Sequence, residues 1–259
     1  MTSVVVCGAM GRMGTIIGRM VNESPDLALA GGVDIKPGSF FGVEVVDSSG
    51  LPRFLEAKKP DVLIDFTIAD AAVQNAKAAA RAGTALVIGT TGFTPVQRAD
   101  MAREIEGNVP AVISSNFSIG VNVFWQLLRV AAPLLSEYDI EVIEAHHRYK
   151  KDAPSGTAKT ILQILDEEIG ERKKQYGREG MKERQKAEIG VHVVRGGDIV
   201  GDHSVLFSGN FETITLAHRA YDRSVFAQGA LRAARWVVTQ EPGIYSMSDV
   251  LKLGVKPAS

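Results

Sequence analysis

The alternation of apolar and polar positions at the start of the chain predicts a strand, a turn, a helix and a second strand. Residues 4–7 form a short β-branched apolar run that ends at Gly8. Apolar residues recur at helical spacing over 12–23, and residues 27–33 form another strand-like run that ends at Asp34. This order predicts a β-turn-α-β unit of the size that binds nucleotides.

Strand-like and helix-like segments continue to alternate up to Phe117. Strands are predicted over 61–66, 85–88 and 109–114, and helices over 70–82 and from Pro95, with Thr94 as an N-cap. Because strands alternate with helices, the sequence predicts a parallel, doubly wound, Rossmann-like sheet of the α/β class.

The pattern changes after Phe117, where strands begin to follow one another. A helix is predicted over 121–135, a strand over 140–145, a helix over 159–169, and strands over 189–195, 204–208 and 213–217. Helices over 224–238 and 247–251 end the chain. We expect an α+β second domain with an open mixed sheet over 118–225, and a first domain formed by 1–117 and 226–259.

Residues 171–186 interrupt this second domain with a highly charged segment that includes seven Lys or Arg residues. We expect a surface loop or a helix end here. Two interpretations of its charge stay open, a solvated face and an anion-binding patch, and the first is the commoner fate of such segments.

The bulk composition excludes several classes of partner. The chain has 259 residues, 45% hydrophobic and 23% charged, with a formal net charge of -1, so no global field favours nucleic acid or a membrane. It has one cysteine, Cys7, no apolar run of transmembrane length and no leader-like start. We expect a cytoplasmic protein without an intrachain disulfide framework.

The first predicted strand is followed by a glycine-rich turn that can bind a pyrophosphate. The turn contains Gly8, Ala9, Met10, Gly11, Arg12 and Met13, and Gly14 completes the spacing GxxGxxG. Glycines let backbone N–H groups approach phosphate oxygens, and the following helix N-terminus adds a partial positive charge. An ordinary turn is the alternative, but the strand–turn–helix context favours dinucleotide binding.

Asp34, at the end of the second strand, is placed to accept hydrogen bonds from an adenosine ribose. Its carboxylate would repel a 2′-phosphate, whereas Arg12 and Lys36 offer a counter-charge. The cofactor is therefore NADH or NADPH, with NADH slightly favoured.

Two further loops follow predicted strands and are candidates for the nicotinamide half of the site. The first contains Gly89, Thr90 and Thr91, and the second Ser114, Ser115, Asn116 and Phe117. In open α/β sheets, ligands bind at the carboxyl ends of strands, although ordinary turn chemistry also explains such residues.

The segment EAHHRYKKDAPSGTA over 144–158 concentrates positive charge at a predicted strand end. On a continuing strand, His146, Arg148 and Lys150 would share one face. A His or Lys can supply the proton that accompanies a reduction, and the helix N-terminus after Pro154 can bind a carboxylate. A solvated basic loop is the alternative, and the histidine pair lacks metal-ligand spacing, so we expect no metal.

Taken together, these motifs resemble the dihydrodipicolinate (4-hydroxy-tetrahydrodipicolinate) reductase family. The segment over 144–158 looks like the family signature, and GAMGRMG, DFT, GTTGF, NFSIGVN and RGGDIVGDHSVLF match in the same order along nearly the whole chain. The histidine–lysine signature is specific, whereas GxxGxxG occurs in many dehydrogenases.

The resemblance implies a reductase that acts on a small dicarboxylate with NADH or NADPH, and a homotetramer. It implies that His146 and Lys150 are catalytic, with Lys150 as proton donor, and that His147, Gly156 and Thr157 contact substrate. It places the cofactor on the glycine turn, Asp34 and the two loops described above. Ile35 stands where many members that use NADPH carry a basic residue, which puts strong NADPH use in doubt.

Two other functions stay open. One is a different two-domain dehydrogenase that acts on a sugar or hydroxy acid, and the other is a non-catalytic dinucleotide sensor. The paired histidines followed by PSGTA count against the first, and a sensor would need neither His146 nor Lys150.

Overall fold

The computed structural model describes residues 1–253 and divides the chain into two compact units. The first unit combines Met1–Ile119 with Arg223–Ser259, of which 254–259, the end of the expected first domain, lie outside the described residues; the second is Gly120–Asp222. Each unit has its own sheet and its own apolar core.

The first unit contains an eight-stranded sheet with the order β13-β7-β6-β5-β1-β2-β4-β3. Its strands are β1 (Thr2–Cys7), β2 (Leu27–Val33), β3 (Gly38–Phe40), β4 (Val43–Val46), β5 (Val62–Asp65), β6 (Ala85–Ile88), β7 (Pro110–Ile113) and β13 (Gly243–Tyr245). Every pairing is parallel except that of β3 with β4. The predicted doubly wound α/β class is confirmed.

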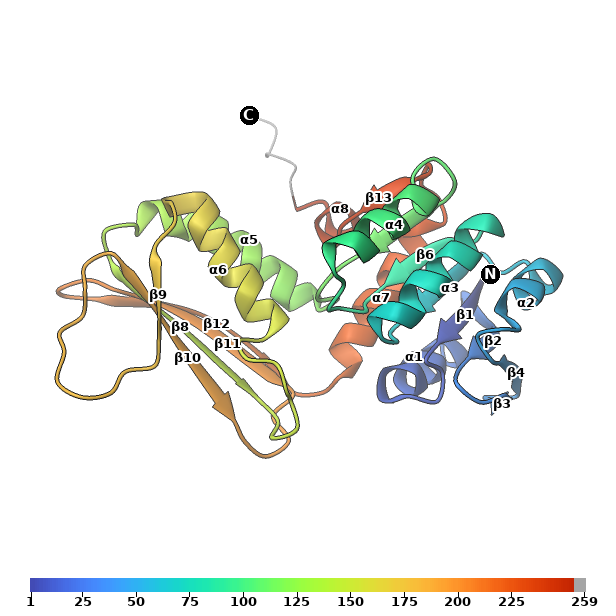
Figure 1. Cartoon of the computed structure of the whole chain (residues 1–259), viewed down its shortest axis with the longest axis horizontal. Helices are drawn as coiled ribbons and strands as arrows, with labels where there is room; N and C mark the ends of the chain where they lie inside the picture. The colour runs from blue at the N-terminus through green and yellow to red at the C-terminus, as the bar shows by residue number, and fades with distance from the viewer. Residues whose placement is uncertain (254–259) are drawn as a thin grey trace. The chain divides into compact units, whose positions relative to one another are not determined.

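Helices cover both faces of this sheet (Figure 1). They are α1 (Arg12–Asn22), α2 (Leu51–Lys58), α3 (Ala69–Arg81), α4 (Pro95–Ile105), α7 (Ser224–Val237) and α8 (Met247–Leu251). Alternate residues of β1 point to opposite faces, so Val4 and Val6 pack in the layer of α1 and α7, and Val5 and Cys7 in the layer of α2, α3 and α4.

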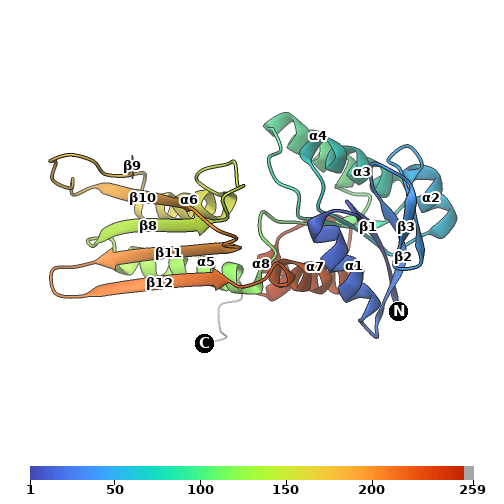
Figure 2. The same ribbon diagram turned by 90° about the horizontal axis from the view of Figure 1, so that it is seen from below.

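The second unit has a five-stranded mixed sheet with two helices on one face (Figure 2). The strand order is β12-β11-β8-β10-β9, with β8 (Asp139–His146), β9 (Lys173–Tyr176), β10 (Glu188–Arg195), β11 (Gly201–Ser208) and β12 (Thr213–Ala220). The helices are α5 (Ile119–Leu134) and α6 (Gly156–Ile169). Residues such as Leu128, Val142 and Ile161 form the core between helices and sheet, as expected for an open mixed sheet.

The structure corrects the sequence predictions at short elements. The predictions did not include β3, β4, α2, β9 and β13, because none of these short segments has the continuous four-residue apolar run that predicted the short β6. Thr94 does cap α4, with a capping box to Gln97, as predicted. Within residues 1–253, no helix is long and apolar enough to span a membrane.

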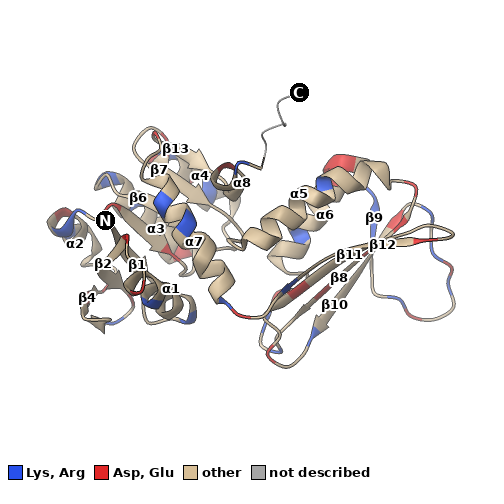
Figure 3. Cartoon of the chain, turned by 180° about the vertical axis from the view of Figure 1, so that it is seen from behind, with Lys and Arg blue, Asp and Glu red and all other residues tan. Residues whose placement is uncertain are grey.

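The charged segment over 171–186 contains one short strand and is otherwise a mostly exposed loop, as expected. The strand is β9, which pairs in parallel with β10, and several basic side chains of the segment are bound to the sheet. Arg178 pairs with Glu141 at 3.0 Å and Glu188 at 2.7 Å, and Arg184 pairs with Asp139 at 2.8 Å. Figure 3 shows the basic residues of this segment and the acidic residues of the sheet. These pairings argue against the anion-binding interpretation.

Candidate functional site

All the residues proposed from the sequence for cofactor binding lie at the carboxyl edge of the first sheet. Neighbouring strand ends are joined by backbone hydrogen bonds. The N–H of Gly8 donates to Val33 O at 2.8 Å, that of Gly89 to Asp65 O at 2.8 Å, and that of Ser114 to Ile88 O at 3.1 Å. Parallel pairing places these loops, distant in sequence, at one end of the sheet.

The glycine turn between β1 and α1 is closely packed on itself. Gly8 has a φ of +74°, a conformation that favours glycine, and a Cβ on Gly14 would lie 2.0 Å from Gly8 O. Gly11 is the N-cap of α1 and provides no side-chain cap. The first-turn N–H groups of α1 therefore meet no capping side chain, which is the arrangement that binds phosphate groups.

Asp34 holds this turn in place. Its Oδ2 accepts a hydrogen bond from Met10 N–H at 2.7 Å, and its Oδ1 accepts one from Ile35 N–H at 2.7 Å. Each carboxylate oxygen has further lone pairs, so ribose hydroxyls can still bind. Arg12, Ile35 and Lys36 are exposed.

Asp65, at the end of β5, organises the middle of the edge and was not proposed from sequence. It is 1% exposed and accepts hydrogen bonds from the hydroxyls of Thr67 at 2.7 Å and Thr90 at 2.8 Å, and from the Asn75 amide at 2.7 Å. The Thr90 side chain is thus buried and bound to Asp65, whereas Thr91 is exposed. The sequence signal for Asp65 was a carboxylate at the end of a buried strand.

The loop after β7 likewise contains both a buried and an exposed residue among those proposed from the sequence. Phe117 is buried in the first core, with its ring 5.6 Å from that of Phe66. The Ser114 hydroxyl donates to Asn116 O at 2.8 Å, and Ser115 is exposed. Phe117 therefore anchors the loop, and Ser115 is its exposed polar residue.

In the second unit, β8 ends in a buried carboxylate–histidine pair. Glu144 Oε2 lies 2.6 Å from His146 Nδ1. Both residues point to the helix-covered face, because alternate residues of a strand share a face. The Arg195 guanidinium binds both oxygens of Glu144, at 2.8 and 3.0 Å, and the backbone N–H of Ser155 donates to Oε1 at 2.9 Å.

This arrangement favours an ionised Glu144. Burial raises its pKa, but hydrogen bonds from His146, Arg195 and the Ser155 N–H outweigh that effect and lower it to about 2. Glu144 is therefore a carboxylate at neutral pH, although its side chain is fully buried.

The prediction that His146, Arg148 and Lys150 share one face of a strand is wrong. The strand ends at His146, and the chain turns, with the Lys150 N–H donating to His147 O at 3.1 Å. The Lys150 ammonium instead pairs with Asp152 at 2.9 Å and is 23% exposed. His147 is half-buried beside the ring of Tyr149.

Helix α6 begins earlier than predicted, at Gly156 rather than Lys159, because Ser155 is its N-cap. The Ser155 hydroxyl accepts a hydrogen bond from Ala158 N–H at 3.2 Å. Thr157 is 7% exposed, and a Cβ on Gly156 would meet no atom within 4 Å. The N-terminus of α6 therefore has open space beside Gly156, directly after the residue that binds Glu144.

His203 on β11 packs against this cluster. Its ring centre is 5.0 Å from that of His146, and its Nε2 lies 3.1 Å from the Ser155 hydroxyl. Burial first, and then the charge of His146, lower the pKa of His203 to about 3. His203 is therefore neutral at neutral pH.

The sequence alone pointed to no role for Glu144, Asp152, Arg195 or His203. The sequence signal for Glu144 was its position on a predicted strand, two residues before His146. In the sequence, Asp152 was recognisable only as an acidic residue close to Lys150. Arg195 and His203 come from β10 and β11, and only the pairing of these strands with β8 brings them close.

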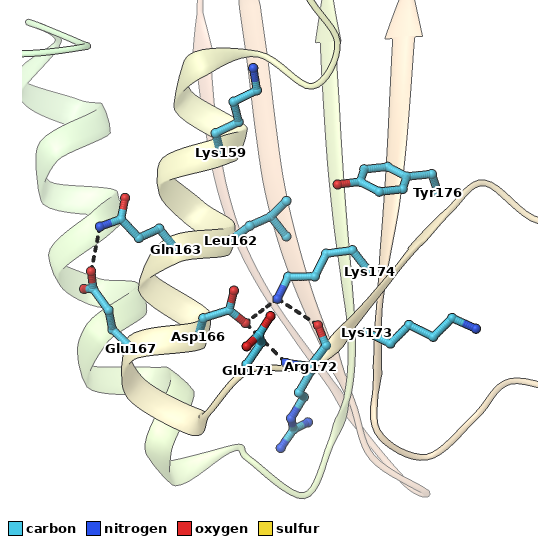
Figure 4. Close-up of a pocket in the computed structure, with 10 residues that line it drawn as sticks. All are labelled: Lys159, Leu162, Gln163, Asp166, Glu167, Glu171, Arg172, Lys173, Lys174 and Tyr176. Carbon is cyan, nitrogen blue, oxygen red and sulfur yellow. Dashed lines mark hydrogen bonds and ion pairs between the residues drawn. The ribbon is translucent and has the colours of Figure 1, made fainter. Parts of the chain in front are cut away.

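A shallow pocket of about 710 Å³ lies between α6 and β9, and none of the proposed site residues lines it (Figure 4). Lys174 extends into it but binds the carboxylate of Asp166 and the backbone oxygen of Arg172. The basic charge of this pocket is thus partly neutralised within the protein.

Comparison with known proteins gives the same assignment over both units. The model for "Dihydrodipicolinate reductase, N-terminus" matches residues 2–117, and that for "Dihydrodipicolinate reductase, C-terminus" matches residues 120–251. The chain is 72% identical over 253 residues to the 4-hydroxy-tetrahydrodipicolinate reductase of Methanoregula boonei, covering 98% of this chain and 99% of the relative. It is 68% identical to that of Methanoculleus marisnigri, covering 98% and 100%.

A solved structure is similar over nearly the whole chain. The dipicolinate-bound dihydrodipicolinate reductase from Paenisporosarcina sp. TG-14 is 28% identical, with a TM-score of 0.78, covering 95% of this chain and 97% of that one. With family models matching both units and relatives matching nearly the full length, the chain belongs to the dihydrodipicolinate reductase family.

Proposed function

We propose that the chain is a 4-hydroxy-tetrahydrodipicolinate reductase, which uses NADH or NADPH to reduce 4-hydroxy-2,3,4,5-tetrahydrodipicolinate to 2,3,4,5-tetrahydrodipicolinate in lysine and diaminopimelate biosynthesis. The observation that carries this proposal is the 72% identity to a relative of that name over nearly the full length of both chains. The buried Glu144–His146 pair beside the N-terminus of α6 is consistent with it.

The carboxyl edge of the first sheet fits a nicotinamide dinucleotide. The closely packed glycine turn and the N-terminus of α1 suit a pyrophosphate, and Asp34 suits the adenosine ribose. We expect Thr91, Ser115 and Asn116 to bind the remaining half. When bound, the nicotinamide supplies a hydride to the substrate. Asp34 disfavours a 2′-phosphate, so we expect a preference for NADH, with Lys36 as the counter-charge for NADPH.

The second unit supplies the groups that bind a dicarboxylate and deliver a proton. The backbone N–H groups at Gly156 and Thr157, at the positive end of α6, bind one substrate carboxylate. The half-buried His147 contributes to substrate binding. Reduction leaves negative charge on the substrate, and Lys150, assisted by His146, protonates it. Asp152 lies 2.9 Å from the Lys150 ammonium and so orients the donor.

We also propose which domain binds each ligand. Residues 1–117 and 226–259 bind the dinucleotide, and residues 118–225 bind the substrate and mediate association into a homotetramer. The eight-residue β12 is an edge strand of the second sheet, and edge strands readily pair with other chains. A biosynthetic reductase that draws on the cellular nicotinamide pool is expected in the cytoplasm.

The proposal is tested by a coupled assay with purified protein. A dihydrodipicolinate synthase converts pyruvate and aspartate semialdehyde into the substrate, and the loss of reduced nicotinamide is followed by absorbance. We expect oxidation of NADH and, more slowly, of NADPH, and none when the synthase is omitted. Failure to oxidise either cofactor would show that the proposed function is wrong.

A further inference from the structure

The carboxylate of Glu144 contacts no residue that we expect to touch substrate except His146. Its two oxygens receive hydrogen bonds from His146, from Arg195 and from the Ser155 N–H. Its side chain is 0% exposed, so it cannot bind substrate. Burying a charged group costs several kcal/mol unless it is paired. A buried carboxylate at this position is therefore expected to serve a function.

The hydrogen bond at Nδ1 determines which nitrogen of His146 carries the proton. An ionised carboxylate only accepts hydrogen bonds, so a neutral imidazole beside it is protonated on Nδ1. The lone pair then lies on Nε2. Nε2 lies beside Gly201 on β11, where a Cβ would come within 3.2 Å of it, so the glycine puts no side chain against this nitrogen.

The other partners of Glu144 hold the carboxylate in one orientation. Arg195 lies directly beside His146 in the β8–β10 pairing and binds both carboxylate oxygens. Its NH2 group also donates to Asp152 O at 2.6 Å, next to the Lys150 turn. The Ser155 N–H connects the same carboxylate to the start of α6. Glu144 is thereby bound to the histidine and to the start of α6, and Arg195 connects it to the turn that carries Lys150.

We infer that Glu144 is a positioning residue for the reduction, which fixes His146 as the Nδ1–H tautomer and presents its Nε2 to the substrate. This inference rests on the proposed function. Carboxylates that orient a catalytic or metal-bound histidine act in the same physical way, and their loss typically costs about 10- to 100-fold in activity.

The test combines kinetics with a direct view of the histidine ring. Histidine labelled with 15N reports, in long-range 1H–15N correlation spectra, which ring nitrogen is protonated; the His146 signals are identified by their absence in His146→Gln. At a pH where the ring is neutral, the wild-type protein should show His146 protonated on Nδ1. Protonation on Nε2 in the wild type would overturn the inference without any variant.

Glu144→Gln retains the shape of the side chain but can donate as well as accept, so it no longer selects a tautomer. We expect kcat to fall about 10- to 100-fold, KM for NADH to stay within about twofold of the wild-type value, and the Nε2–H form of His146 to appear. Glu144→Asp, which retains the charge, should recover part of kcat and the Nδ1–H form. Wild-type kcat in Glu144→Gln, or an unchanged tautomer, would contradict the inference.

The chain contains a matched control on the same strand. Glu141 pairs with His192 at 2.7 Å on the opposite face of the sheet from Glu144, so Glu141→Gln breaks a similar carboxylate–histidine pair away from the proposed chemistry. It should leave the His146 tautomer unchanged and kcat within about twofold of the wild-type value. If the wild type oxidises no cofactor, the proposed function is wrong, while the spectrum still decides whether Glu144 fixes the ring.

Discussion

The carboxylate of Asp34 lies 2.7 Å from the backbone nitrogen of Met10 and thereby ties the end of the second strand to the glycine turn. Its other oxygen accepts the Ile35 N–H at the same distance. Asp34 therefore has two functions that the sequence could not separate. It shapes the turn that is proposed to receive the pyrophosphate, and in the same proposal it puts negative charge where a 2′-phosphate would bind.

Asp34→Asn is expected to shift cofactor preference towards NADPH while weakening the turn. An amide removes the charge but accepts only at one atom, so one of the two backbone N–H groups loses its partner at a cost of about 1 kcal/mol. The dissociation constants for NADH and NADPH, measured by fluorescence titration, should show a larger loss for NADH. Asp47→Asn, which alters another turn-forming carboxylate of the same unit, is the control and should change neither constant. Equal losses for both cofactors would show that Asp34 acts only on the turn.

Lys150→Met is expected to lower kcat about 100-fold or more, with a smaller change in KM, because it removes the proposed proton donor but keeps the apolar stem. Steady-state kinetics in the coupled assay measure both constants. Lys151→Met removes the charge of the adjacent, exposed lysine and should leave kcat near the wild-type value. If the Lys150 variant turns over at the wild-type rate, another group donates the proton.

Gly156→Ala is expected to raise KM for the substrate about tenfold without loss of stability. The new Cβ meets no protein atom within 4 Å, and alanine is favoured over glycine in a helix by about 0.5–1 kcal/mol, but the methyl group enters the space beside the N-terminus of α6. Thermal unfolding and substrate KM are the two measurements. Gly196→Ala, also without a nearby atom, is the control. An unchanged KM would place the substrate carboxylate elsewhere.

His203→Gln is expected to make the protein less sensitive to acid. The folded-state pKa of His203 is about 3, below the ordinary value near 6.5, so the unfolded chain binds this proton first as the pH falls. The free energy of unfolding therefore falls by about 2 kcal/mol as the pH is lowered from 6.5 to 4.5. Glu144 adds its own loss only from about pH 4.5 down to its pKa of about 2.

Denaturant unfolding at several pH values tests this effect. The difference between wild type and His203→Gln at about pH 8, where histidine is neutral, gives the packing cost of the substitution alone. The wild type should then lose more stability than the variant on acidification to pH 4.5. Parallel curves would mean that His203 takes up its proton in the folded state as readily as in the unfolded chain.

The sequence by itself determined the class of fold, the family and the local motifs. Strand and helix periodicity predicted the long elements, because each period adds to the signal, and the glycine spacing and the histidine–lysine signature are properties of contiguous residues. The helix cap at Thr94 was also predictable, since a capping box involves residues only three apart.

Only the tertiary structure decided which residues surround His146. Glu144 and His146 are neighbours on one strand, but Arg195 and His203 reach them through strand pairings that no local pattern specifies. The same holds for Asp65, whose bonds to Thr67, Asn75 and Thr90 connect three segments. Sheet pairing and burial are long-range properties of the folded chain, and they turn a run of basic residues into a buried carboxylate–histidine pair beside a helix N-terminus.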